Sequence, residues 1–283
     1  MLDRQFVLNL ANQIANFQQR NNGYLARQEL ERLHSELCHD EKRLEPFGFK
    51  VYSQGDEDGI IEEICRRLKM TLGTFFEIGV ENGLECNSLY LIHRGWKGCW
   101  IEGNQNYCDS IQKKFASIIP RRLQLFSKTV SVDNINSLIV EAGFDRNNLD
   151  FLSIDIDGND IYLLECLEHF PKIICIEYNA RFPGNLIKKQ VYDPKRFWQE
   201  TDYFGSSLSA LCEAADKKGY RLVGTNITGT NAFFVRSDLV ENLFCENCSP
   251  EGLYNPPRYW LIFDHYKYVG HPPDFGPYAD LTE

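Results

Sequence analysis

The stretch Phe76-Glu77-Ile78-Gly79-Val80-Glu81-Asn82-Gly83 decides the fold, because an apolar run typical of a buried strand enters a turn bounded by two glycines. Gly79 can adopt backbone angles that are closed to other residues, and it lets the chain approach a ligand closely. Ligands of open parallel sheets bind beyond the carboxyl ends of the strands. The stretch therefore predicts a strand and a turn that contact a nucleotide-like cofactor.

From this strand onward, apolar strand patterns alternate with helical ones. The expected strands cover 74–80, 99–102, 123–127, 151–155 and 173–177, with helices expected at 88–93, 107–118, 134–142 and 162–169. Helices between strands imply right-handed crossovers and a mostly parallel sheet. A helix over 208–218 precedes two strands, 220–224 and 232–235, which a short loop joins as a hairpin. The count predicts an α/β protein with the class I methyltransferase, Rossmann-like fold: a mostly parallel seven-stranded sheet whose last strand is antiparallel.

Three segments are expected along the chain. Residues 1–50 form a helical N-terminal extension, in which Phe6, Leu10 and Ile14 recur at helical spacing and Asn21-Asn22-Gly23 predicts a break between two helices. Residues 51–240 form the cofactor-binding domain. Residues 241–283 form an irregular tail, rich in Pro and Tyr, that packs on the domain. The extension is a lid, a dimer face or a cover on the sheet, and a homodimer is one expected assembly.

Charge and composition restrict the partners. A formal net charge of −10 argues against electrostatic capture of nucleic acid or of an anionic membrane, so neither is an expected partner. No apolar run approaches the length of a bilayer span and no secretion signal is recognised, so the predicted location is cytoplasmic. The ten cysteines are scattered, and the single CxxC, Cys245–Cys248, lacks a second ligand pair, which favours reduced thiols over a zinc site.

A carboxylate follows the second strand. Trp100-Ile101-Glu102-Gly103-Asn104 ends this strand with Glu102, which lies 25 residues after Glu77. A carboxylate in this position accepts hydrogen bonds from the ribose hydroxyls of an adenosine group, as the acid of dinucleotide sites does. Glu102 therefore strengthens the prediction of an adenosine-bearing cofactor.

Three motifs together resemble the FkbM-like methyltransferases that depend on S-adenosylmethionine (SAM). They are Phe76–Gly83, Gly95–Glu102 and Leu149–Gly158, within a resemblance that covers roughly Tyr52 to Val235. The resemblance implies a class I fold, SAM as cofactor, and O-methylation of a sugar or another small polar metabolite. The sequence departs from the family pattern twice: Glu81-Asn82 replaces the middle glycine of the turn, and Asp155-x-Asp157 stands where one acid followed by Glu-Gly is common.

The resemblance also implies which residues bind the cofactor. Glu77 and Gly79 are expected at the methionine end of SAM, Glu102 at the ribose, and the end of the third strand at the adenine, with the segment that ends in Gln54 reaching the cofactor. The full set of predicted cofactor-binding residues is Gln54, Glu77, Gly79, Asn82, Gly83, Glu102, Asn104, Thr129, Val130 and Asp155.

Acidic residues at two neighbouring strand ends suggest the chemistry. Asp155, Asp157 and Glu177 are expected to lie close together, where three carboxylates repel one another unless they are protonated or share a cation. They are candidate Mg²⁺ ligands that orient a substrate diol, or one of them is a general base. The predicted catalytic residues are Asp155, Asp157, Glu177 and Asn179, and the predicted acceptor-side residues are Arg181, Tyr203, Ser206 and Ser207.

Two other functions stay open. Asp155-x-Asp157 after a buried strand also suits a metal-dependent glycosyltransferase that uses a nucleotide sugar. Loss of the middle glycine also suits a methyltransferase-like domain that has no cofactor and serves as an interaction module. The expected partner of the enzyme is a small-molecule acceptor, a sugar or a glycosylated metabolite.

Overall fold

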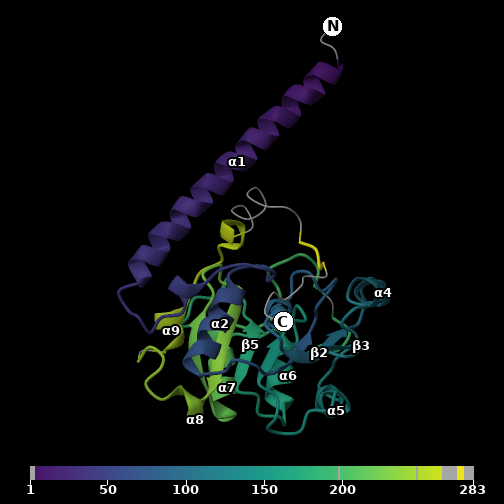
Figure 1. The fold of residues 1–283 in the computed structure, drawn as a ribbon. Helices are drawn as coiled ribbons and strands as arrows, with labels where there is room; N and C mark the ends of the chain where they lie inside the picture. The colour runs from purple at the N-terminus through teal and green to yellow at the C-terminus, as the bar shows by residue number, and fades with distance from the viewer. Residues whose placement is uncertain (1–3, 197, 247, 263–272, 277–283) are drawn as a thin grey trace.

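A computed structural model describes residues 4–196, 198–246, 248–262 and 273–276 of the chain (Figure 1). The strands are β1 (Thr74–Ile78), β2 (Lys97–Glu102), β3 (Leu123–Ser127), β4 (Phe151–Ile154), β5 (Ile173–Glu177), β6 (Tyr220–Thr225) and β7 (Asn231–Arg236). The helices are α1 (Arg4–Leu37), α2 (Glu57–Arg67), α3 (Leu89–His93), α4 (Gln105–Lys114), α5 (Ile135–Glu141), α6 (Asp160–Cys166), α7 (Leu208–Lys217), α8 (Ser237–Val240) and α9 (Pro250–Leu253), with a 3-10 turn at Glu45–Phe47.

The seven strands form one sheet in the order β3-β2-β1-β4-β5-β7-β6. Neighbours from β3 to β5 pair in parallel, and β7 pairs antiparallel with both β5 and β6. The order reverses between β1 and β4, which marks the switch point where an open α/β sheet binds its ligand. The predicted class I, Rossmann-like α/β fold is therefore confirmed, including its antiparallel last strand.

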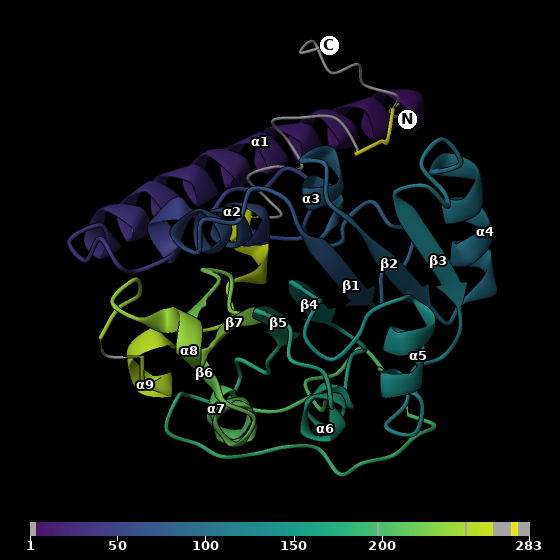
Figure 2. The ribbon, with the colours of Figure 1, turned by 60° about the horizontal axis from the view of Figure 1, so that its bottom comes forward.

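Alternating side chains send two apolar layers to opposite faces of the sheet. Phe75 of β1 packs in a core with Ile60 of α2 and Ile111 of α4, whereas its neighbour Phe76 packs in a second core with Leu164 of α6. Figure 2 shows α2 and α3 over one face of the sheet and α5, α6 and α7 over the other. Because both faces are covered, the central strand β5 is an almost continuous apolar run, as parallel strands usually are.

The N-terminal extension differs from the prediction. Helix α1 runs without a break from Arg4 to Leu37, so the expected interruption at Asn21-Asn22-Gly23 is wrong. Gly23 lies on the buried side of α1 together with Ala26 and Leu30, where the absence of a side chain permits close approach. In the same region, helical structure ends well before residue 50, apart from the short turn at Glu45–Phe47.

The described part of the tail lies against the domain. Asn255 accepts a hydrogen bond from the buried Tyr178 hydroxyl through its carbonyl at 2.7 Å, and the Leu253 carbonyl accepts one from Thr225. The Phe275 ring lies 4.5 Å from the ring of Phe115 between centroids. Among the described residues, no helix is both long and apolar enough to cross a bilayer.

Candidate functional site

The carboxyl ends of β1 and β4 meet at the predicted glycine turn. Gly79 has φ +81°, and a Cβ atom there would overlap the carbonyl oxygen of Asp155, which follows β4. Gly83, with φ +76°, packs against the ring of Trp100 from β2. Both glycines are thus required by left-handed backbone angles and by close neighbours. The turn brings the ends of the two central strands into contact.

Glu81 adopts the conformation that a glycine would favour. Its φ is +49°, inside the left-handed region that few non-glycine residues occupy. Its backbone N–H donates to the carboxylate of Glu102 at 2.8 Å, and the other oxygen of Glu102 accepts the N–H of Asn104 at 2.7 Å. The missing middle glycine has therefore not changed the path of the turn, and Glu102 ties the turn to the end of β2.

A narrow cavity of about 30 Å³ opens beside this turn. Its lining contains five of the predicted cofactor residues, Gln54, Glu77, Gly79, Asn82 and Asp155, together with Val80, Glu81, Glu85, Cys86, Asn87 and Asn231. Both Glu77 oxygens already accept hydrogen bonds, from the N–H groups of Asn87 and Ser88 at 2.7 and 2.9 Å. Burial raises the pKa of Glu77. Glu77 therefore holds the chain that follows the turn.

The acids at the start of α2 hold the loop that carries Gln54. Asp58 accepts three consecutive backbone N–H groups, from residues 51–53, at 2.6–3.0 Å. Glu57 accepts the side-chain amide of Asn231 on β7 at 3.0 Å. The bonds to Tyr52, Ser53 and Asn231 are buried, and a buried charge-assisted hydrogen bond is stronger than one at the surface. The loop is thereby fastened to the sheet at the edge of the cavity.

Four other predicted residues lie at the same edge of the sheet but do not line this narrow cavity. Glu102 is the last residue of β2, and Asn104 caps α4 by accepting the N–H of Asn106 at 2.9 Å. Thr129 and Val130 follow β3, and Thr129 lies next to Gly103 at the end of β2. These four residues border the turn on its far side from β4.

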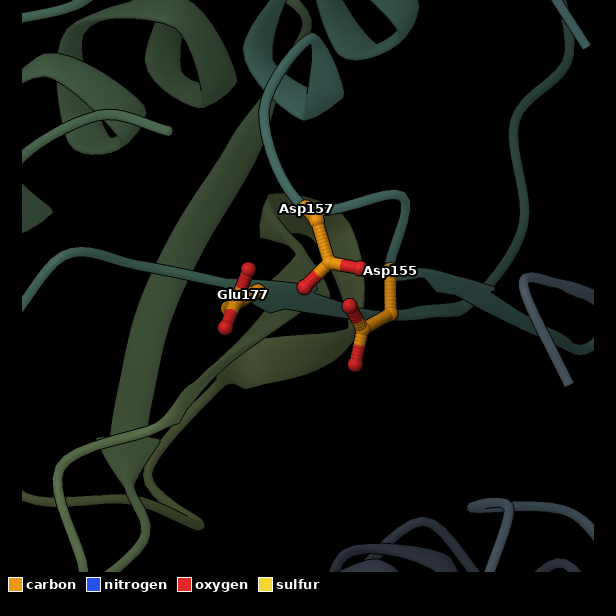
Figure 3. A group of neighbouring side chains, drawn as sticks. All are labelled: Asp155, Asp157 and Glu177. Atoms are coloured by element: carbon orange, nitrogen blue, oxygen red, sulfur yellow. The ribbon is translucent and has the colours of Figure 1, made fainter. Parts of the chain in front are cut away.

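Asp155, Asp157 and Glu177 converge at the ends of β4 and β5 (Figure 3). One carboxylate oxygen from each lies within 4.8 Å of the other two. Burial raises the pKa of Asp155 and of Glu177 well above the usual range, and neighbouring carboxylates raise both further. Burial also raises the pKa of Asp157. Three such groups cannot all be ionised without a cation between them.

Asp160 holds the turn that carries Asp157, one of the three residues of this carboxylate cluster. Its two oxygens accept the backbone N–H groups of Ile156 and Gly158 at 2.8 Å each. These bonds close the turn between β4 and α6, in which Asp157 has φ +56° and an exposed side chain. Burial raises the pKa of Asp160 to about 6. The Glu177 atom Oε2 is buried and has no hydrogen-bond partner in the described chain.

A second, wider cavity of about 600 Å³ adjoins the carboxylate cluster. It shares Gln54, Glu81 and Glu85 with the narrow cavity. The rest of its lining is Lys50, Gly55, Asp157, Glu177, Trp198, Phe204, Thr228, Thr230, Tyr259 and Trp260. The sequence analysis did not predict the aromatic residues of this lining. The available signal was that Trp198 and Trp260 lie outside the predicted strands and helices.

The predicted acceptor-side residues mostly lie elsewhere. Ser206 and Ser207 are fully buried, and Ser207 caps α7. Arg181 forms an exposed ion pair with Asp202 at 3.0 Å. The Tyr203 ring is half-exposed and lies 4.4 Å from the guanidinium of Arg196. None of these four residues lines either cavity.

Asn179 holds the loop that follows β5. Its buried amide nitrogen donates to the carbonyls of Asp202 and Phe204 at 2.9 Å each, and its oxygen accepts the N–H of Arg181 at 3.1 Å. Because these bonds occupy the amide, Asn179 positions Phe204 at the wall of the wide cavity.

Comparison with known proteins finds resemblance in structure alone. No family model matches the sequence, and no curated protein matches it. Similar solved structures include the N-terminal domain of EvdMO1 with SAH bound (14% identity over 74% of this chain and 94% of that chain, TM-score 0.42). Others are a putative caffeoyl-CoA O-methyltransferase from Staphylococcus aureus (14%, 76% and 99%, TM-score 0.46) and a SAM-dependent methyltransferase from Aquifex aeolicus (13%, 74% and 97%, TM-score 0.39). At these identities and TM-scores the matches assign no activity, and membership of the FkbM-like family stays a prediction.

Proposed function

We propose that this chain is a SAM-dependent methyltransferase that methylates an oxygen of a small polar acceptor, a sugar or a related metabolite. The observation that carries the proposal is the meeting of the glycine turn, Glu102 and two joined cavities at the switch point of a class I sheet. An FkbM-like enzyme acting in the cytoplasm is the finer form of the same proposal.

The chemistry of the narrow cavity fits SAM. Its acidic lining suits the ammonium and sulfonium charges of the cofactor, and Gly79 is part of that lining. We assign Gln54, Glu77, Gly79, Asn82, Gly83 and Asp155 to the methionine part, Glu102 and Asn104 to the ribose, and Thr129 and Val130 to the adenine. Glu81 and Glu85 border both cavities, which therefore adjoin each other.

The wide cavity is the proposed binding site for the acceptor. Trp198 and Trp260, each about half-exposed, offer flat apolar faces to a ring, and Thr228 and Thr230 offer hydroxyls. The adjoining carboxylate cluster contacts the acceptor hydroxyls. This site does not include Ser206 and Ser207, which are buried, or Arg181 and Tyr203, which do not line the cavity.

Methyl transfer requires the chain to align the acceptor oxygen with the methyl group and to remove the proton from that oxygen. When bound, SAM supplies a methyl group activated by its sulfonium. Asp155, Asp157 and Glu177 then serve in one of two ways. They hold Mg²⁺, which would bind a diol and lower the pKa of its hydroxyl, or one of them takes the proton directly. The unpartnered oxygen of Glu177 favours the metal.

Calorimetric titration with SAM and with S-adenosylhomocysteine tests the cofactor. We expect binding in the micromolar range by the wild-type chain and at least tenfold weaker binding by Glu102→Gln, because the amide accepts less well from the ribose hydroxyls. The control is Trp260→Ala, which should bind SAM as the wild type does and lose turnover of an acceptor.

The other outcomes separate the alternatives. Absence of binding to either compound, together with binding of a uridine-diphosphate sugar in the presence of Mn²⁺, would instead identify a glycosyltransferase. If neither kind of ligand binds, the results would instead favour an interaction module that has no cofactor.

A further inference from the structure

Helix α1 has two apolar faces, and only one of them packs against the domain. Gly23, Ala26, Leu30 and Leu33 are buried. Ala26, Leu30 and Leu33 pack in a cluster that includes Ile227 of the β6–β7 loop. From Arg4 to Asn22, every residue except Gln19 is exposed. Figures 1 and 2 show this half of the helix running along and beyond the domain.

The exposed face follows a heptad pattern. Val7 and Ile14 alternate with Leu10 and Phe17 at steps of three and four residues, and the pattern continues through Asn21 and Tyr24. The four apolar side chains from Val7 to Phe17 are 46–72% exposed, and Tyr24 is 60% exposed. Such steps place all six side chains on one stripe of the helix.

The two faces are on opposite sides of α1. Taking Val7 as position a of the heptad, the exposed stripe occupies positions a and d, whereas the buried residues 23, 26, 30 and 33 occupy c and f. At about 100° per residue, the centres of the two stripes are roughly 160° apart. The helix can therefore stay docked on its own domain while its other face binds a partner.

The residue types on the exposed stripe favour a second copy of the same helix. Val7 and Ile14 are β-branched at position a, and Leu10 is at position d, a combination that favours two strands. Asn21 is a polar residue at position a, where it can bond only to its own counterpart in a parallel, in-register pair. Gln13 at position g and Gln18 at the following position e can donate to each other across such a pair, whereas Arg20 occupies the next position g.

The core of the seam is uncharged. From Arg4 to Gln28 the helix carries three arginines, Arg4, Arg20 and Arg27, and no acid. Arg27 is paired with Glu31 of its own helix at 2.9 Å, and Arg20 lies at position g beside the seam. Positions a and d from Val7 to Tyr24 hold no charged residue, so no charge has to be buried when two helices pair.

We propose that residues 7–24 of α1 form a parallel, two-stranded coiled coil with the same helix of a second copy of this chain. The seam is about 27 Å long at 1.5 Å per residue, which is short for a coiled coil. A weak dimer is therefore expected, in equilibrium with monomer at micromolar chain concentrations. The assembly places the two domains at the same end of the pair, and each keeps its own cavities.

Sedimentation velocity of the full chain, from about 1 to 100 µM, tests the proposal. The wild type should shift from monomer to dimer over this range. Ile14→Glu should weaken the dimer at least tenfold, because it places a charge in the seam. Leu8→Glu makes a similar change at an exposed position outside the seam, so its dimerisation should match the wild type within about twofold.

Two further variants test the geometry of the pair. Asn21→Ile should tighten association at least tenfold and admit larger oligomers, because the polar residue at position a restricts the pair to two strands. Under mild oxidation, Ile14→Cys should give a disulfide-linked dimer that neither the wild type nor Leu8→Cys gives.

Several results would overturn the coiled coil. One is a wild-type chain that stays monomeric at 100 µM, and another is equal loss of association in Ile14→Glu and Leu8→Glu. A third is a monomer that binds phosphatidylglycerol vesicles and loses that binding in both variants, because the helix would then lie on a membrane surface. Titration of Ile14→Glu with SAM tests the proposed activity independently of dimerisation. Its affinity for the cofactor should equal that of the wild type.

Discussion

Single residues at the site are held in backbone conformations that their types rarely adopt. Glu81 has φ +49° and Asp157 φ +56°, and both are acids on the lining of the wide cavity. Glycine would adopt these angles without strain, whereas an L side chain is disfavoured there by roughly 1–2 kcal/mol. Such strain persists where the surroundings hold it, which is typical of binding sites.

At Glu81 the usual order of glycine and alanine should reverse. We expect Glu81→Gly to be more stable than Glu81→Ala by about 1 kcal/mol, because only glycine is free of the left-handed strain. Chemical denaturation of both variants measures the difference. Glu141 of helix α5 is the control position, where alanine should exceed glycine by about 1 kcal/mol. Equal stability of the two Glu81 variants would contradict the strained backbone.

At the scale of elements, two adjacent strands and the turns after them assemble the carboxylate cluster. β4 delivers Asp155 and Asp157, and β5 delivers Glu177. In parallel neighbours the carboxyl ends lie at the same sheet edge, so acids far apart in sequence become neighbours. Asp160 then fixes the turn that carries Asp157.

Mg²⁺ should stabilise the folded chain through this cluster. A ligand that binds only the folded state raises the midpoint of thermal unfolding, so we expect an increase of a few degrees when millimolar Mg²⁺ replaces EDTA. Glu177→Gln should lose this increase. Glu165→Gln, which alters an exposed ion pair on α6, should keep it. If neither the midpoint of thermal unfolding nor the turnover changes with Mg²⁺ or EDTA, the metal site is refuted. One of the carboxylates would then be the general base.

At the scale of the whole molecule, buried acids connect segments that are distant in sequence. Asp56 accepts the backbone N–H of Ile227 at 3.2 Å, and Glu57 accepts the side-chain amide of Asn226 at 2.7 Å. Burial, with the charge of Glu57, raises the pKa of Asp56 to about 8, and burial raises that of Asp58 to about 6. The start of α2 is therefore joined to the β6–β7 hairpin through Asp56 and Glu57, and the pKa of Asp56 lies near neutrality.

These raised pKa values predict that stability falls as pH rises. A carboxyl group whose folded pKa exceeds its unfolded value stabilises the fold most below the unfolded pKa, near 4, and loses that contribution as pH rises through the folded pKa. For Asp56 the window is pH 4 to 8, with a slope of at most about 1.4 kcal/mol per pH unit.

The Asp56→Asn variant tests this dependence. Its free energy of unfolding, relative to the wild type, should increase steadily from pH 4 to pH 8, because the amide does not ionise. Denaturant titrations at each pH measure the difference. Asp109→Asn, at an exposed position on α4, is the control for loss of a surface carboxylate. A difference that does not vary with pH would refute the raised pKa of Asp56.

Much of the fold could be predicted from the sequence because its signals are local. The apolar runs at 123–127 and 173–177 mark β3 and β5 at their observed bounds, and the hairpin loop after residue 225 predicts the antiparallel strand. The glycine turn and the acids after β2, β4 and β5 are likewise recognisable, since each follows directly from a strand. The convergence of Asp155, Asp157 and Glu177 also follows, because parallel strands end at one edge.

Only the tertiary structure decided the rest, because those features depend on contacts between distant segments. Periodicity could not place β7 between β5 and β6, nor could it keep α1 continuous through Asn21-Asn22-Gly23, where packing of Gly23 overrides a local break signal. The wide cavity joins Trp198 from the loop after β5 with Trp260 from the tail, and burial turns Ser206 and Ser207 inward. Strand and helix patterns depend on residues that are neighbours in the sequence. Cavity walls and buried faces depend on contacts that form only when the chain packs.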